Sequence, residues 1–290
     1  EILMSEKTVS QRTGPALPCW YELAVPDLEQ AVTFYSGTLP WTVGDPTVPG
    51  FSYRIAADPD GNGVAGLTDT LQTGSAPPHW IIYLEVEDCD ATTAQAVKQV
   101  FFIFYSATYL MNTGRFAVLT DPQGAVFGIL QPLPMEDPPA TRAFDQQRIG
   151  HGNWHDLSTS DPQSALAFYS ELFGWSAGES MDMGEHGTYQ MFDAGDTTLG
   201  GINAVMEDPR PSWVPYFGVE QVDATVEAVT GADLVLDGVT GIGGRPGLSQ
   251  TAVTLVDAIA DEAIRQGHLD AAAPPPAASN PLHGPQQALA

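Results

Sequence analysis

The chain has 290 residues, of which 36 are Asp or Glu and only 10 are Lys or Arg, so its net charge at pH 7 is −26. This negative charge repels phosphate backbones and anionic membranes, which argues against nucleic acid and membranes as partners. Cys19 and Cys89 are too few for a disulfide framework or a zinc knuckle. Residues 1–17 show no signal-peptide pattern, and the longest apolar run, 100–111, is too short to span a bilayer. We therefore expect a cytoplasmic protein.

A strand-and-helix unit is written twice in the sequence. Residues 20–41 read WYELAVPDLEQAVTFYSGTLPW, and residues 154–175 read WHDLSTSDPQSALAFYSELFGW. Trp20, Asp27 and Trp41 recur after a constant shift of 134 residues as Trp154, Asp161 and Trp175. A fixed offset over a whole strand and helix indicates a duplication.

The first half predicts a strand, a helix and further strands, and then the same order again. Residues 20–25 alternate as in a half-buried strand, and Asp27 with Gln30 predicts the start of a helix. Strands are expected in FSYRIAAD and VAGLTD, on either side of a turn at 59–63. HWIIYLEV restarts the pattern at His79, followed by a helix and by RFAVLTDPQGAVFGIL, which reads as two strands around a DPQG turn.

The second half repeats this order until Gly231, after which the correspondence fails. Residues 213–229 match residues 80–96, but no second DPQG turn follows. The expected organisation is a flexible leader (1–17), a first lobe (18–131), a Pro-rich linker (132–147), a second lobe with a degenerate C-terminal end (148–265) and a disordered Ala/Pro-rich tail (266–290).

These motifs, in order and in duplicate, resemble the vicinal oxygen chelate superfamily, which includes glyoxalase I, extradiol dioxygenases and bleomycin-resistance proteins. The two-lobed glyoxalase-like proteins of actinobacteria are the most similar type. The resemblance implies an α+β fold of tandem βαβββ modules, in which each lobe curls a mixed sheet into a cup. The second lobe should be incomplete. Because this superfamily hosts many activities, the resemblance fixes the fold more closely than the function.

Metal-using members of the superfamily place ligands on the first strand of each module and on the strand after the DPxG turn. The matching positions here are Trp20, Ile81 and Gly128 in the first lobe and Trp154 and Val214 in the second. None of these side chains is a good transition-metal ligand. We therefore expect no metal and no cofactor.

Acidic and aromatic residues recur on the strand face where the resemblance places the cup. Glu22 and Asp156 occupy the same repeat position, as do Tyr83 and Tyr216. A buried acid is costly unless it is paired, so each acid is either a ligand contact or general base, or one end of a structural hydrogen bond. The tryptophans could be a ligand platform or filler. The candidate ligand-binding set is Trp20, Glu22, Ile81, Tyr83, Gly128, Trp154, Asp156 and Tyr216; no catalytic residue can be assigned.

Two other features have structural interpretations. His155 shares the strand face of Leu157, which predicts a structural histidine, whereas His79 could stand at the rim of the cup. The uncharged run at 100–111 predicts a buried strand, with a lobe–lobe or subunit contact as one explanation.

The leading functional hypothesis is a metal-independent protein that binds and sequesters a small hydrophobic or aromatic molecule, as a monomer or homodimer. A second hypothesis is an enzyme of lyase or dioxygenase type, which uses a metal or acid–base chemistry at Glu22 or Asp156. A third is an interaction protein in which both cups are vestigial.

Overall fold

The computed structural model describes residues 14–46, 52–69, 78–99, 103–110, 113–134, 142–184, 187–204 and 211–230. The first lobe contains β1 (Pro18–Val25), α1 (Leu28–Thr38), β2 (Thr42–Val43), β3 (Tyr53–Ala57), β4 (Gly63–Asp69), β5 (His79–Glu85), α2 (Cys89–Ala96), β6 (Ile103–Leu110), β7 (Gly114–Thr120) and β8 (Val126–Pro132). The second contains β9 (Gly152–Thr159), α3 (Pro162–Phe173), β10 (Ser176–Asp182), β11 (Thr188–Ala194), β12 (Thr197–Ala204), β13 (Ser212–Phe217) and α4 (Val222–Thr230).

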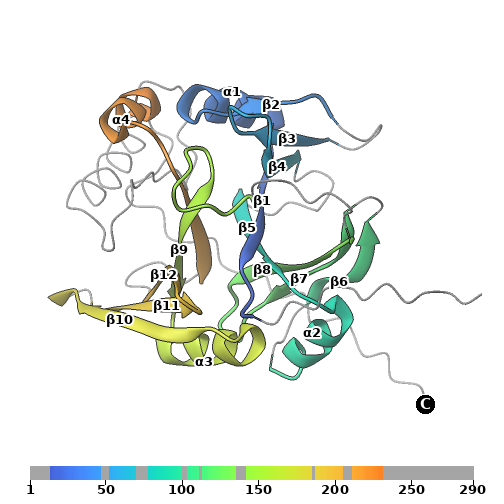
Figure 1. Ribbon diagram of the computed structural model, residues 1–290, viewed down its shortest axis with the longest axis vertical. Coiled ribbons are helices and arrows are strands. Elements are labelled where there is room, and N and C mark those ends of the chain that lie inside the picture. The colour runs from blue at the N-terminus through green and yellow to red at the C-terminus, as the bar shows by residue number, and fades with distance from the viewer. Residues whose placement is uncertain are drawn as a thin grey trace, which may run out of the picture.

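The strands form two mixed sheets, as the tandem βαβββ pattern predicts (Figure 1). The eight-stranded sheet has the order β2-β3-β4-β1-β5-β8-β7-β6, and the five-stranded sheet has the order β10-β11-β12-β9-β13. In the first, β1 pairs parallel with β4 and antiparallel with β5. In the second, β9 makes the same two pairings with β12 and β13. The second lobe therefore repeats the first up to α4, and the predicted degenerate end and tail lie outside the described residues.

The helices begin where the sequence places an aspartate. The carboxylates of Asp27, Asp88 and Asp161 each accept a hydrogen bond from a backbone N–H three residues later, at 2.9–3.0 Å. Each bond satisfies a donor that the first helical turn leaves without a partner inside the helix. Gly174 ends α3 in the left-handed region, at φ 71°, where a glycine adds no Cβ strain. The predicted N-cap role of Asp27 is confirmed.

The main apolar core lies between the two lobes. Tyr21, Leu23 and Val25 are buried in it, so one face of β1 points into this core. Trp20 lies at its margin, while Ile81 and Tyr83 of the neighbouring β5 form a separate small cluster. The alternation predicted for β1 and β5 therefore separates a packed face from the face that lines the cup of the first sheet.

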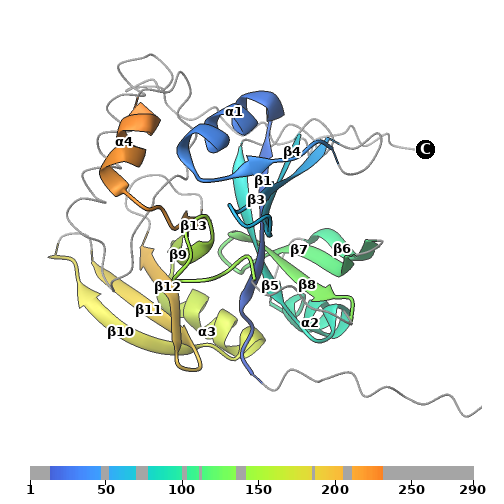
Figure 2. The same ribbon diagram turned by 45° about the horizontal axis from the view of Figure 1, so that its top comes forward.

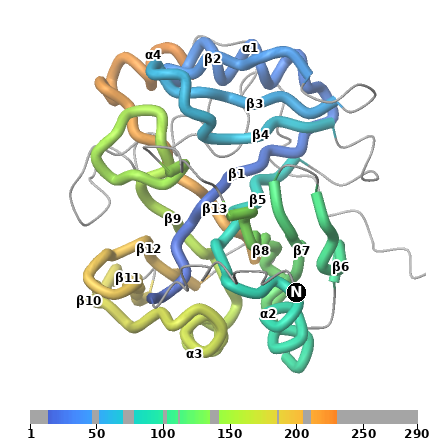
Figure 3. The backbone as a smooth tube through the Cα atoms, turned by 45° about the vertical axis from the view of Figure 1, so that its right-hand side comes forward, coloured from blue at the N-terminus to red at the C-terminus, as the bar shows by residue number. Residues whose placement is uncertain are grey.

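The lobes contact each other through equivalent residues, in the manner of a two-fold pair. Tyr21 Oη lies 2.9 Å from Nε2 of His155, its equivalent 134 residues later, and the rings stack. Trp41 Nε1 donates to the Gly150 carbonyl at 2.7 Å. Its equivalent, Trp175, donates to the Ala16 carbonyl at the same distance. Likewise α1 contacts α4 and α2 contacts α3 (Figures 2 and 3).

The described part of the apolar run 100–111 is the strand β6, which is exposed, and this corrects the prediction of a buried strand. Within β6, Phe104 is 60% exposed and Tyr109 is 58% exposed. The strand stands at the border of the larger sheet, with β7 as its neighbour (Figure 1). A run without polar alternation is typical of a buried strand. Because β6 is the last strand in the order, its outer edge has no neighbouring strand among the described residues.

Short segments assigned to the leader and the linker pack onto the lobes. Ala16 is buried, and the Leu17 carbonyl accepts a hydrogen bond from Glu85 N at 2.9 Å. Ala143 is also buried, and Phe144 forms a β-bridge with Gly152. Among the residues that the structure describes, no helix is long and apolar enough to cross a membrane.

Candidate functional site

The cup of the first sheet holds a network of one carboxylate, two tyrosines and a tryptophan. Tyr83 on β5 donates a hydrogen bond to Glu22 Oε1 on β1 at 3.3 Å. Tyr53 on β3 also bonds this carboxylate. Its hydroxyl accepts from Trp20 Nε1 at 2.9 Å. The network joins three strands through side chains of one face, and Glu22 is only partly buried.

Glycines on the neighbouring strands make room for the two tyrosine rings. A Cβ on Gly66, which pairs with Glu22, would lie 1.9 Å from Tyr53 Oη. A Cβ on Gly128, which pairs with Tyr83, would lie 2.3 Å from Tyr83 Cδ1. Both distances are impossible for real atoms, so a side chain at either position would displace the ring. The predicted site residue Gly128 therefore acts by having no side chain.

Apolar side chains complete the first-lobe cup. Ile81 pairs directly opposite Glu22 across the β1–β5 ladder and is buried together with Tyr83 and Val118. Cys19, Trp20, Phe116, Val126 and Leu130 pack around them. Burial raises the pKa of Glu22, and the bonds from Tyr83 and Tyr53 offset part of that rise. The cup therefore holds a carboxyl group that binds a proton more readily than an exposed glutamate.

The second lobe contains an equivalent network, which is closed. Asp156 accepts hydrogen bonds from Tyr189 Oη at 2.5 Å, Tyr216 Oη at 2.6 Å and Trp154 Nε1 at 3.2 Å. Trp154 Nε1 also donates to Tyr189 Oη at 2.8 Å. A Cβ on Gly201 would lie 1.9 Å from the Tyr189 ring. Burial raises the pKa of Asp156, and the three donors offset part of the rise.

The two networks differ in how completely the acid is enclosed. Asp156 is only 6% exposed, and both of its oxygens accept short bonds. Glu22 is partly exposed, and its bond from Tyr83 is long at 3.3 Å. A hydrogen bond of that length is weak, so a stronger donor from a ligand can compete for the Glu22 oxygens. The carboxyl group of Glu22 is therefore less enclosed than that of Asp156.

The structure brings the predicted site residues together in two groups. Trp20, Glu22, Ile81, Tyr83 and Gly128 line the first cup, and Trp154, Asp156 and Tyr216 share the second network.

Sequence reasoning missed Tyr53 and Tyr189, which bind the two acids. They occupy equivalent strands but stand 136 residues apart, because the loops before them differ in length. A search at the constant shift of 134 therefore passes over them, whereas aligning SYRIAAD with TYQMFDAG finds them.

The described residues do not fit a transition metal in either cup. The positions where the resemblance implies ligands carry Trp20, Ile81 and Gly128, which offer no donor atom for a metal. The nearby oxygen atoms belong to one carboxylate and two tyrosines whose hydroxyls burial holds in the protonated form, because it raises their pKa. Within the part of the chain that the structure describes, no group of three His, Cys, Asp or Glu residues could hold a metal ion.

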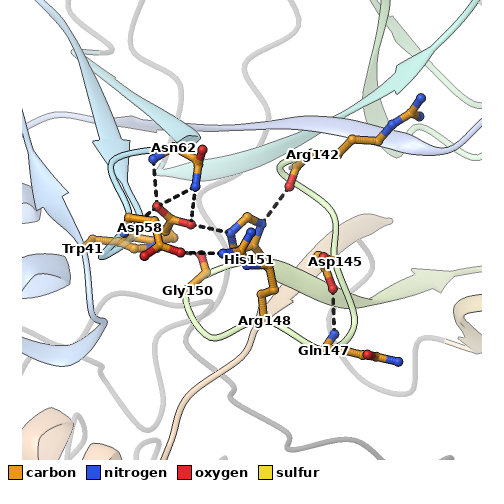
Figure 4. A network of polar contacts seen from close by, with 10 residues as sticks. Trp41, Asp58, Asn62, Arg142, Asp145, Gln147, Arg148, Gly150 and His151 are labelled. Atoms are coloured by element: carbon orange, nitrogen blue, oxygen red, sulfur yellow. Dashed lines mark hydrogen bonds and ion pairs between the residues drawn. The ribbon is translucent and has the colours of Figure 1, made fainter. Parts of the chain in front are cut away.

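The buried histidines belong to the lobe interface. His151 Nε2 lies 2.9 Å from Asp58 Oδ2, and its Nδ1 lies 2.7 Å from the Arg142 carbonyl (Figure 4). Asp58 also accepts bonds from the backbone and side chain of Asn62. His155 is fully enclosed, and burial lowers its pKa to about 4. It accepts from Tyr21, because its Nδ1 donates to the Leu199 carbonyl at 2.8 Å.

Comparison with known proteins agrees with this architecture. Residues 19–129 match the family model of the Glyoxalase/Bleomycin resistance protein/Dioxygenase superfamily. The chain is 30% identical over 227 residues to "Putative glyoxylase CFP32" of Mycobacterium bovis, covering 74% of this chain and 82% of that protein. It is 28% identical over 230 residues to the anthracycline biosynthesis protein DnrV of Streptomyces peucetius, covering 74% of this chain and 81% of that protein.

A solved structure shares the fold. Homoprotocatechuate 2,3-dioxygenase from Arthrobacter globiformis superposes with a TM-score of 0.52 at 13% identity, covering 75% of this chain and 70% of the enzyme. At that identity the likeness concerns the fold alone. Together, the two cupped sheets, the duplicated modules and the relatives over most of their length place this chain in the Glyoxalase/Bleomycin resistance protein/Dioxygenase superfamily.

Proposed function

We propose that this protein binds a small planar aromatic molecule in the cup of the first lobe, without a metal, and that Glu22 is its polar anchor. The observation that carries the proposal is the difference between the two acid networks. Asp156 is almost fully buried and accepts bonds from three donors, two of them at 2.5 and 2.6 Å, whereas Glu22 is partly exposed and accepts a bond from Tyr53 and a long bond of 3.3 Å from Tyr83. The geometry is repeated in both lobes and is more enclosed in the second, which favours a ligand site in the first.

The lining favours a particular class of ligand. Ile81, Val118 and the rings of Trp20 and Tyr83 offer apolar and aromatic surface, which suits a flat hydrophobic molecule. A single carboxyl group favours a hydrogen-bond donor or a cation over an anion. The net charge of −26 attracts cations from a distance and repels anions. DnrV, a relative named for anthracycline biosynthesis, supports a polycyclic aromatic compound as the type of ligand.

Calorimetric titration of the full chain with an anthracycline, a planar molecule that carries an ammonium group, tests the proposal. Glu22→Gln should weaken binding by about 1–3 kcal/mol, because it removes a charged acceptor. Trp20→Ala should also weaken binding, since it removes apolar contact. Glu179→Gln, at an exposed acid on β10, is the matched control and should leave the affinity unchanged. Equal affinities in all four proteins would place the ligand elsewhere.

Elemental analysis tests metal independence separately. We expect elemental analysis of the purified protein to give far less than one Zn, Ni, Fe or Mn per chain, because the cup positions carry Trp20, Ile81 and Gly128. We also expect a chelator to leave the melting temperature unchanged. A metal content of about one per lobe, removed by chelator with a loss of thermal stability, would contradict the proposal.

A second candidate function is acid–base catalysis in the same cup. The observation that favours it is the raised pKa of Glu22, since a carboxyl group that titrates closer to neutral pH is a better general acid or base. If the protein converts the bound molecule, Glu22→Gln should abolish turnover while Tyr83→Phe preserves most of it. Recovery of the unaltered molecule from the complex, checked by mass spectrometry, would leave binding as the function.

A further inference from the structure

The turn between β3 and β4 ends in the only asparagine of the chain that is followed by a glycine, Asn62-Gly63. In such a pair the backbone nitrogen of the glycine can attack the side-chain carboxamide of the asparagine, because no Cβ stands in its way. Asn62 is half-buried, and Gly61 and Gly63 on either side of it are exposed, so water reaches the turn. The equivalent turn of the second lobe, 195–196 between β11 and β12, has no asparagine.

A single carboxylate holds this asparagine in place. Both oxygens of Asp58 accept hydrogen bonds from Asn62 Nδ2, at 3.1 and 2.9 Å, and Oδ1 also accepts from Asn62 N at 2.7 Å (Figure 4). Asp58 N in turn donates to the Asn62 carbonyl at 2.9 Å. The side chain and both backbone groups of Asn62 therefore bond the same residue. While these bonds last, the carboxamide is directed towards Asp58 and cannot turn towards Gly63 N.

Contacts from the other lobe support this carboxylate. His151 Nε2 lies 2.9 Å from Asp58 Oδ2, and both side chains are buried. Arg148 pairs with Asp60 of the same turn at 2.5 Å. Both contacts come from the segment that leads into β9, across the lobe boundary. Docking of the lobes therefore supports the bonds that restrain Asn62.

We propose that Asn62 is a site of spontaneous deamidation, which Asp58 suppresses as long as the lobes are docked. When Asn62 is released, Gly63 N forms a bond to Asn62 Cγ, and the bond from Cγ to the amide nitrogen breaks. That nitrogen leaves as ammonia with the proton of Gly63 N, and a succinimide ring remains. Water then opens the ring at either of its carbonyl carbons. The product is aspartate, or isoaspartate, in which the main chain runs through the former side chain. Water is the only other reactant.

The product does not fit the docked turn. Either form lacks the amide hydrogens that Asp58 accepts, and it places a second negative charge beside Asp58. Isoaspartate also lengthens the main chain directly before Gly63. There is little room for this, because even a Cβ on Gly63 would lie 3.4 Å from the Trp20 ring. Deamidation therefore weakens the contact between the lobes, and the change is irreversible.

Peptide mass mapping of the full chain during incubation at neutral pH tests the proposal. In the wild type, Asn62 should deamidate at least about tenfold more slowly in the native state than in urea, because the free energy of one hydrogen bond to a charged acceptor corresponds to about a factor of ten. Asp58→Ala, which removes the acceptor, should raise the native rate at least about tenfold. Ile202→Val, at a buried residue of β12 away from the turn, is the control for a general loss of stability and should leave the rate unchanged. A thermal melt confirms that each variant is folded, and the comparison of native and unfolded wild type needs no variant.

Two further variants separate the reaction from its effect. Added to Asp58→Ala, Gly63→Ala should return the rate towards that of the wild type, because its methyl group shields the attacking nitrogen. Asn62→Asp, which copies the aspartate product, should melt at a lower temperature than Asn62→Ala, which loses the same donors without adding a charge. Equal rates in native and unfolded wild type, no acceleration in Asp58→Ala, an equal acceleration in Ile202→Val, or an Asn62→Asp protein as stable as the wild type would each overturn the proposal.

Discussion

At the scale of single residues, the two cups show how one arrangement of side chains can have two roles. Each cup contains a tryptophan, a carboxylate and two tyrosines on equivalent strands. In the second lobe Tyr216 donates to Asp156 over 2.6 Å, and both residues are buried. In the first lobe Tyr83 donates over 3.3 Å to a partly exposed Glu22. The hydroxyl groups of the equivalent residues Tyr83 and Tyr216 should therefore contribute differently to the stability of the fold.

Removing the two hydroxyls tests this difference. We expect Tyr216→Phe to lower the free energy of unfolding by about 2–3 kcal/mol, because it leaves a buried carboxylate oxygen without its donor. Tyr83→Phe should lower it by less than about 1 kcal/mol, since the bond is weak and Glu22 can reach water. Urea unfolding of both variants gives the comparison. Similar losses in the two lobes would show that Glu22 is as enclosed as Asp156.

At the scale of elements, the strands that flank the acids depend on glycines. Gly128 on β8 lies beneath the Tyr83 ring, and an added Cβ would overlap it at 2.3 Å. By contrast, Gly37 lies within α1, where an added Cβ would meet nothing within 4 Å. One glycine is required by close packing, and the other is a cost to helix stability.

Substituting each glycine by alanine should change stability in opposite directions. Gly128→Ala should lower the free energy of unfolding by about 1–3 kcal/mol, because the Tyr83 ring must move. Gly37→Ala should raise it by up to about 1 kcal/mol, as alanine is the better helix former. Thermal or urea unfolding measures both. If Gly128→Ala is neutral, Tyr83 does not lie flat against β8.

The same scale shows what the sequence can predict. Paired motifs at a constant shift predict both β1–α1 and β9–α3 and the face of Glu22, because periodicity determines which side chains share a side of a strand. The exposure of β6 could not be predicted in this way. Whether an apolar strand is covered depends on its neighbours in the sheet, and its own residues do not encode that order. Tyr53 was not predicted, because loops of different length place its equivalent, Tyr189, 136 residues later and not 134.

At the scale of the whole molecule, a buried hydrogen bond between Asp58 and His151 joins the lobes. Asp58 sits in the β3–β4 turn, and His151 precedes β9 (Figure 4). Burial alone would raise the pKa of Asp58, but hydrogen bonds from Asn62 and His151 outweigh it and lower the pKa to about 2. Because this is below the ordinary value of 3.8, the folded state binds fewer protons at Asp58 than the unfolded state between these pH values.

Stability should therefore depend on Asp58 in acid. Its contribution of roughly 2 kcal/mol is fully present above about pH 4 and is lost as the pH falls towards 2. The free energies of unfolding of wild type and Asp58→Asn should differ most near pH 6. At pH 2 this difference should be smaller by roughly 2 kcal/mol. Asp60→Asn, at an exposed acid of the same turn, is the control. A constant gap would show that Asp58 titrates alike in both states.

The reciprocal tryptophan contacts can form only late in the synthesis of the chain. Trp41 is anchored by Gly150, and Trp175 is anchored by Ala16. During synthesis Trp41 leaves the ribosome more than 100 residues before Gly150 and Phe217, the two residues that contact it from the second half of the chain. Until then the apolar face of the first lobe is exposed to other nascent chains and to chaperones. Slowing translation between the lobes should lengthen that interval and raise the fraction of newly made protein that aggregates.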